Sequence, residues 1–263
     1  MKYILVTALL FLLPTLTLAQ SCEGQTPCTL GDRAYHVLPP DNWDGTSPLP
    51  VLVHFHGWQR TGALPVNHAR ISGHARRRGV LLLAPNGRNK TWDFWQGRSA
   101  DVDFAAAVIE DAAKRYPIDR ERIYISGYSF GSAMAWRYAC ENGNDVAALL
   151  AISGTLRQTE DCPEAPAQVR HVHGLDDAVM DFPFGPNGDT TYPVRLWRDL
   201  YGCAEGQPQG TWQAVDWLTL ERTTWECDGG TVTLDIHPGG HFIPHGWIGW
   251  QLDQLMGRTP RYP

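Results

Sequence analysis

The stretch Arg122-Ile123-Tyr124-Ile125-Ser126-Gly127-Tyr128-Ser129-Phe130-Gly131 decides the fold. Its first residues form a short apolar run typical of a buried strand, and the pattern from Ser129 to about Cys140 is helical. The turn between them has the form Gly-x-Ser-x-Gly, in which the glycines leave room for a tight turn and the serine hydroxyl is exposed. The positive end of the helix dipole then lies beneath the serine oxygen. The segment therefore predicts a strand–turn–helix unit with Ser129 as a candidate nucleophile.

Strand-like and helical patterns alternate on both sides of this unit. The apolar runs 51–55 and 80–84 are nearly continuous, as expected for a parallel sheet that is covered on both faces. Residues 101–116 carry a helical apolar stripe that ends at Pro117. Further strands are expected at 33–38, 146–152, 169–172 and 232–236. The sequence predicts an α/β fold with a mostly parallel central sheet and helices on both faces, with the ligand site beyond the carboxyl ends of the strands.

A serine nucleophile needs a base and an orienting acid, which in this architecture follow in the order Asp, then His. The loop after strand 169–172 contains three candidate acids. We predict Asp177 as the acid; Asp176 stays open as an alternative, and Asp181 as a more remote one.

The segment after strand 232–236 contains three histidines. We predict His241 as the base, because it follows two glycines and precedes the final helix, where a loop can present an imidazole to Ser129. His237 is expected at the strand end and His245 in the helix.

Acyl transfer also needs N–H donors for the negative charge of its tetrahedral intermediate. The backbone N–H groups of Phe130 and Trp58 are the predicted donors, because they follow the nucleophile and the strand 51–55 respectively. His54 and His56 have a spacing that zinc sites use, but no third ligand is evident, so no metal and no cofactor are expected.

Composition excludes several classes of function. The 263 residues are 43% hydrophobic and 19% charged with a net charge of −6, which indicates a globular chain rather than a disordered one. The basic run 76–78 is too short for a nucleic-acid footprint and is interpreted as a solvated helix face.

Residues 1–19 have a basic start, a short apolar core and a small residue at a plausible cleavage point, which predicts a signal peptide. We therefore expect a single domain over 20–263, extracellular or periplasmic, that acts as a monomer and does not associate with a membrane after cleavage.

An exported chain is oxidised, and its six cysteines are an even number. Proximity in the sequence favours three pairs: Cys22–Cys28, Cys140–Cys162 and Cys203–Cys227.

Eleven tryptophans and nine tyrosines exceed what buried packing usually requires. Trp92 and Trp95 follow the strand 80–84 among Gly, Asn and Asp residues, so we predict that at least one ring faces the substrate; burial of both rings is the alternative.

Residues 33–250 resemble the secreted α/β-hydrolase esterases that include poly(3-hydroxybutyrate) depolymerase-like proteins and the feruloyl and acetyl-xylan esterases of carbohydrate esterase family 1. The shared motifs are His56-Gly57, Pro85-Asn86-Gly87, Asp101-Val102-Asp103-Phe104, the turn at Ser129, His173-Gly174 before Asp177, and Gly239-Gly240-His241. Two residues depart from the pattern of these esterases. Trp58 replaces the small residue or cysteine that usually follows His-Gly, and Ser132 replaces the glycine that commonly follows the last glycine of the turn.

The resemblance implies an α/β-hydrolase fold and a serine carboxylic ester hydrolase with Ser129, Asp177 and His241 as its triad. The implied substrate is a feruloyl or acetyl ester of plant polysaccharide, and the first alternative is a polyester such as a polyhydroxyalkanoate. A serine peptidase or a non-catalytic glycan-binding relative is the second alternative. The residues leave the natural acyl group open.

Overall fold

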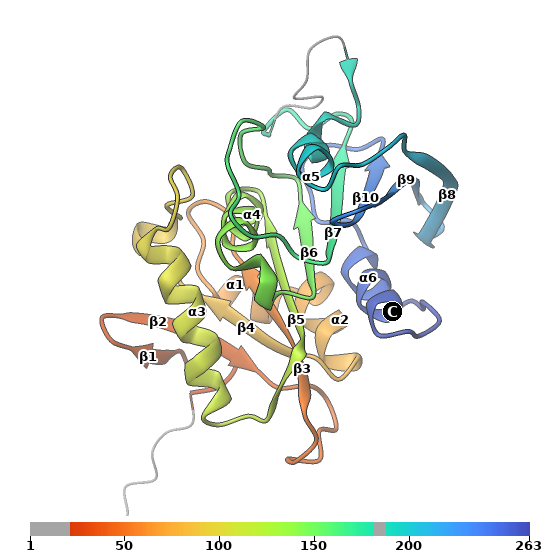
Figure 1. Cartoon of the computed structure of the whole chain (residues 1–263). Helices are drawn as coiled ribbons and strands as arrows, with labels where there is room; N and C mark the ends of the chain where they lie inside the picture. Colours follow the sequence, from red (N-terminus) through yellow and green to blue (C-terminus); the bar gives the residue numbers. More distant parts are fainter. Residues whose placement is uncertain (1–21, 181–187) are drawn as a thin grey trace, which may run out of the picture.

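The described part of the protein, residues 22–180 and 188–263 of a computed structural model, contains one ten-stranded sheet (Figure 1). Across the sheet the strands follow the order β1-β2-β4-β3-β5-β6-β7-β10-β9-β8. Their bounds are β1 Cys28–Leu30, β2 Arg33–Leu38, β3 Leu49–Phe55, β4 Leu81–Pro85, β5 Ile118–Tyr128, β6 Ala148–Ile152, β7 Gln168–Gly174, β8 Gln207–Val215, β9 Leu218–Cys227 and β10 Gly230–His237. The predicted signal peptide lies outside the described residues.

The middle of the sheet is parallel, as predicted. Strands β4, β3, β5, β6, β7 and β10 pair in parallel, and antiparallel strands extend the sheet on both sides. The carboxyl ends of the parallel strands therefore meet along one edge of the sheet, and the loops after them carry the predicted site residues.

Two apolar cores cover the two faces of the sheet. One contains Val102 and Val108 of helix α3 together with Trp136 of helix α4, and the other contains Ile248 and Leu252 of helix α6. The helices are α1 Ala63–Asn67, α2 His74–Arg77, α3 Ala100–Ala113, α4 Phe130–Asn142, α5 Arg195–Leu200 and α6 Trp247–Leu255. In the described ranges no helix is both long enough and apolar enough to cross a membrane.

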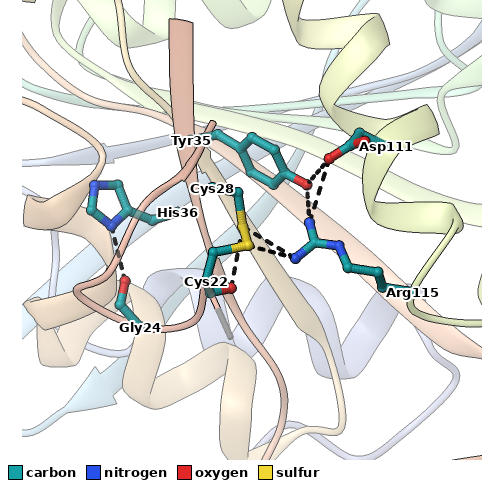
Figure 2. Close-up of a disulfide and its surroundings, with 7 residues drawn as sticks. All are labelled: Cys22, Gly24, Cys28, Tyr35, His36, Asp111 and Arg115. Carbon is teal, nitrogen blue, oxygen red and sulfur yellow. Dashed lines mark hydrogen bonds and ion pairs between the residues drawn. A yellow bond between two sulfur atoms is a disulfide. The ribbon is translucent and has the colours of Figure 1, made fainter. Parts of the chain in front are cut away.

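A disulfide fastens the N-terminal end of the described chain to the sheet and to helix α3. Figure 2 shows Arg115 beside the bridge between Cys22 and Cys28, with one guanidinium nitrogen 2.7 Å from the Cys22 sulfur. The same guanidinium donates to the hydroxyl of Tyr35, which in turn donates to Asp111 at 2.8 Å. The bridge thus belongs to a polar cluster that joins β2 to α3.

The other two disulfides also join the pairs that proximity in the sequence favours. Cys140 near the end of α4 is bonded to Cys162, and Cys203 after α5 is bonded to Cys227 at the end of β9. No described cysteine is free.

The expectation that the basic run 76–78 forms a solvated helix face is wrong for one of its residues. Arg76 and Arg77 are exposed, but the Arg78 side chain is fully buried. Its guanidinium donates to Asp253 at 2.8 Å and to the carbonyl of Arg261 at 2.6 Å. Because the carboxylate compensates the buried cation, this arginine belongs to the interior and ties α2 to the C-terminal segment.

Candidate active site

Ser129 lies at the sharp turn between β5 and α4. Its backbone has φ 58° and ψ −125°, a left-handed conformation that is uncommon for a residue with a side chain. The Ser129 amide donates to the carbonyl of Ile152 at 3.0 Å, which fixes the turn against β6.

The glycines of the turn are required by close backbone contacts. A Cβ atom at Gly127 would lie 2.0 Å from the carbonyl oxygen of Gly131, and one at Gly131 would lie 2.0 Å from the carbonyl oxygen of Phe55. Helix α4 can start this close to the ends of β5 and β3 only because both positions lack a side chain.

Asp177 and His241 are joined by a hydrogen bond of 2.7 Å between Oδ2 and Nδ1. The second carboxylate oxygen accepts the backbone amides of Val179 and Met180, each at 2.9 Å. Burial alone would raise the pKa of Asp177, but hydrogen bonds from His173, His241 and these amides outweigh it and hold the pKa well below its usual range. The carboxylate is therefore ionised and oriented.

The alternative acids differ from Asp177 in position. Asp176 is exposed, and its recorded contact is a backbone hydrogen bond from its amide to the carbonyl of Gly239. Asp181 lies outside the described residues.

His241 is held beside the nucleophile turn by the residue that precedes Ser129. The Tyr128 hydroxyl donates to the carbonyl of His241 at 2.9 Å, and the two rings are 4.7 Å apart. His237 instead accepts the amide of Gly239 through Nδ1. His245 precedes α6 rather than lying in it, and its ring contacts Trp217.

The loop after β3 brings its backbone to Ser129. A Cβ atom placed on Gly57 would lie 3.7 Å from the Cβ of Ser129, which is ordinary van der Waals contact. Among the described loops and turns, the amides of Gln59 and Ser129 donate to backbone carbonyls, whereas those of Trp58 and Phe130 donate to none. Their role as donors to the oxyanion stays a prediction.

His56 fixes this loop. Its Nε2 accepts the amide of Gly87 at 3.0 Å, so its Nδ1 carries the proton and donates to the carbonyl of Gly57 at 2.8 Å. Burial lowers the pKa of His56 to about 4, so the ring is neutral at pH 7. His54 lies near Ser126 instead, at 3.1 Å. Within 22–180 and 188–263, no group of three His, Cys, Asp or Glu side chains is arranged to hold a metal ion.

The two tryptophans predicted to contact the substrate lie in different environments. Trp92 is 2% exposed, and its indole N–H donates to the carbonyl of His56 at 2.7 Å. This corrects the prediction for Trp92, because a ring buried beneath the loop cannot touch a substrate. Trp95 is 58% exposed and lines a cavity.

That cavity has a volume of about 410 Å³, and two of its lining rings, Phe94 and Trp95, contact the residue after Ser129. Phe130, directly after Ser129, contacts the rings of Phe94 and Trp95 at 5.3 and 6.2 Å. The rest of the wall comes from the loop after β6, from Met180, whose amide donates to Asp177, and from Tyr192. The lining is Phe94, Trp95, Thr155, Leu156, Arg157, Gln158, Thr159, Glu160, Met180 and Tyr192.

The sequence reasoning missed Tyr128, the loop 155–160 and His173 as parts of this region. Two signals in the sequence could have indicated them. Tyr128 lies inside the Gly-x-Ser-x-Gly turn, and residues 155–160 follow a predicted strand of the parallel sheet.

Comparisons with known proteins relate the chain to a hydrolase family and to several esterases. Residues 97–195 match the model of the Phospholipase/Carboxylesterase family. Feruloyl esterase C of Emericella nidulans is 28% identical over 223 residues, which are 81% of this chain and 77% of that protein. The bifunctional acetylxylan esterase/xylanase XynS20E of Neocallimastix patriciarum is 29% identical over 152 residues, which are 57% of this chain and 22% of that protein.

Solved structures show the same fold. The acetyl xylan esterase from Aspergillus awamori superposes with a TM-score of 0.64 at 14% identity, over 85% of this chain and 94% of that one. The predicted α/β-hydrolase fold and the predicted resemblance to feruloyl and acetyl-xylan esterases are confirmed. The matched part of the chain spans 22% and 59% of the lengths of the first two curated relatives.

Proposed function

We propose that this protein is a serine carboxylic ester hydrolase in which Ser129, His241 and Asp177 form the catalytic triad. The observation that carries the proposal is the hydrogen bond of 2.7 Å between His241 and a buried, ionised Asp177, beside a serine on a strand–turn–helix unit. The carboxylate accepts the Nδ1 proton, so Nε2 of His241 is the basic nitrogen.

In the proposed reaction, Nε2 of His241 takes the proton of the Ser129 hydroxyl as its oxygen attacks the ester carbonyl. The oxyanion accepts the N–H groups of Phe130 and Trp58. His241 then gives the proton to the leaving alcohol, and the acyl group stays on Ser129. Water, activated by the same imidazole, releases the acid and restores the serine.

We further propose that the acyl group is a hydroxycinnamoyl or acetyl group carried by a plant polysaccharide. The relatives named feruloyl esterase C and acetylxylan esterase support this substrate class. The cavity lined by the rings of Phe94, Trp95 and Tyr192 suits a flat acyl group, and Phe130, directly after Ser129, contacts the first two of these rings. Parallel assays on methyl ferulate, acetylated xylan and polyhydroxybutyrate separate this class from a polyester.

Export is part of the proposal. The pattern of residues 1–19 and the three disulfides support a protein that leaves the cytoplasm and works outside the cell or in the periplasm.

The direct test is Ser129→Ala. Hydrolysis of p-nitrophenyl acetate should lose several orders of magnitude in kcat, because triad members act as a unit, while the circular dichroism spectrum stays unchanged. Ser153→Ala is the matched control, since Ser153 is also buried, also has a positive φ, and follows the neighbouring strand β6. A folded Ser129→Ala protein with most of its activity would refute the proposal.

A further inference from the structure

The carboxylate of Asp177 lies between two imidazoles. Its Oδ2 is 2.7 Å from Nδ1 of His241 and 3.4 Å from Nε2 of His173. The side chains of Asp177 and His173 are both fully buried. We infer that His173 is a positioning residue, a second imidazole N–H that holds the acid of the triad in the orientation His241 needs. This inference rests on the proposed function, because it assigns Asp177 to the reaction.

The chemistry of the partners decides which nitrogen of His173 carries the proton. An ionised carboxylate only accepts hydrogen bonds, so the nitrogen that faces it must be protonated. Burial lowers the pKa of His173, so its ring is neutral and has a single N–H. That N–H is therefore on Nε2, and Nδ1 is an acceptor.

The next residue on the same face of β7 completes the chain of donors. Nε2 of His171 is 3.1 Å from Nδ1 of His173 and must be its donor. His171 is itself neutral, because full burial lowers its pKa well below the ordinary value. The donors run in one direction, from His171 to His173 to Asp177, and His241 donates from the other side.

Packing holds the rings of His171 and His173 in place. The two rings of β7 are stacked 5.4 Å apart, and Trp136 of α4 contacts His171 edge-on at 5.8 Å. Two further groups face His173: the carbonyl of Met180, a second acceptor for the ring, and His237, whose pKa burial lowers to about 4. Both are uncharged near neutral pH, so among the described residues packed against the ring Asp177 supplies the charge that faces it.

The position of His173 is consistent with a positioning role and not with a direct catalytic one. Its ring is inaccessible to solvent, whereas the His241 side chain is 13% exposed. A ring behind the carboxylate cannot reach a substrate, so its removal should lower kcat and leave KM unchanged. Without it, Oδ2 keeps one donor, and rotation of the carboxylate away from His241 is no longer opposed.

The experiment compares His173→Gln with His173→Asn in the full-length protein. The glutamine amide reaches the position of Nε2 and still donates to Asp177, whereas the asparagine amide ends at the position of Nδ1. For p-nitrophenyl acetate we expect His173→Asn to lower kcat by about 10- to 100-fold, the range that loss of the partner orienting a metal ligand gives in metalloenzymes. His173→Gln should recover most of that loss, and KM should change in neither variant.

A spectroscopic readout tests the same hydrogen bond without activity. The short bond between His241 and Asp177 should give a proton resonance far downfield in the wild type and in His173→Gln, and His173→Asn should weaken or shift it. His54→Phe is the control, because it removes a buried imidazole that does not touch Asp177. If His173→Asn does not fold, His173→Phe makes the same test with an apolar ring.

Three results would overturn the inference: kcat in His173→Asn within twofold of the wild type, equal losses in His173→Gln and His173→Asn, or an unchanged downfield resonance in His173→Asn. Absence of hydrolysis by the wild type would instead contradict the proposed function, and the resonance would still report on the contact of His173.

Discussion

At the scale of single residues, the two adjacent carboxylates after β7 have the same chemistry and opposite environments. Asp177 is 3% exposed and accepts hydrogen bonds from His241 and from two backbone amides, whereas Asp176 is exposed to solvent. Asp177→Asn should therefore lower kcat by about 10⁴-fold, the loss seen when a triad carboxylate becomes an amide. Asp176→Asn should stay within a few-fold of the wild type. Steady-state kinetics at pH 7.5 distinguish them, and the reverse order of severity would make Asp176 the acid.

The two tryptophans after β4 give a second prediction at this scale. Trp95→Leu should raise KM for methyl ferulate about 2- to 12-fold, since a ring contact is worth about 0.5–1.5 kcal/mol, with little change in Tm. Trp92→Leu should instead lower Tm and reduce activity on methyl ferulate and on a short acetyl ester alike, because it removes the hydrogen bond to His56 from the core. A Trp95→Leu variant with equal losses on both esters and a lower Tm would remove this ring from the substrate site.

Residues with a local signature could be predicted from the sequence, and those defined by three-dimensional contacts could not. Ser129 stands in a motif, and His241 follows two glycines after a strand. The burial of Trp92 depends on the carbonyl of His56, 36 residues away, and the contact of His173 depends on how its strand faces Asp177. His173 stands in the His-Gly motif before Asp177, but neither contact can be read from the residues along the chain.

At the scale of elements, the turn from β5 to α4 depends on Gly131. Gly131→Ala would place a Cβ atom 2.0 Å from a backbone oxygen of β3, which cannot move without shifting the strand. We expect a loss of about 1–3 kcal/mol in the free energy of unfolding, measured with urea, together with a loss of activity. Gly97→Ala is the control, because its new methyl group would meet only the end of the Glu141 side chain, at 3.4 Å. Equal stability of the two variants would show that the turn can relax.

The elements that could be predicted are those whose burial leaves a continuous apolar run. Strands β3 and β4 are buried along their whole length, and the sequence locates both within two residues. The hairpin of β8 and β9 was missed because β8 is exposed over Gln207–Thr211 and has no apolar alternation. Its pairing with β9 and β10 is a tertiary contact that a local pattern does not record.

At the scale of the whole molecule, neutral histidines in the interior make stability depend on pH. Burial lowers the pKa of His54 and His74 to about 3 and that of His56 and His237 to about 4. In the unfolded chain these groups bind protons near pH 6.5. Between about pH 6.5 and 4 the unfolded state therefore holds more protons, and stability falls as the pH falls, by up to about 1.4 kcal/mol per pH unit for each group.

Urea unfolding at pH 7.5, 5.5 and 4.5 measures this dependence. The free energy of unfolding should drop across the series, and His54→Gln should make the drop shallower than in the wild type. Asp177 adds to the loss only below about pH 4, because its lowered pKa stabilises the fold above the ordinary value for a carboxyl. A free energy that stays constant from pH 7.5 to 4.5 would contradict the assignment of neutral buried rings.

The three disulfides close segments that follow one another along the chain without overlap, with separations of 6, 22 and 24 residues. When a polypeptide crosses a membrane with its N-terminus first, each cysteine pair is complete before the first cysteine of the next pair emerges. An oxidant on the far side then meets only two unpaired thiols at a time, and these are the correct partners. Maturation during translocation should therefore proceed without a disulfide isomerase, whereas refolding from the fully reduced chain must choose among 15 pairings.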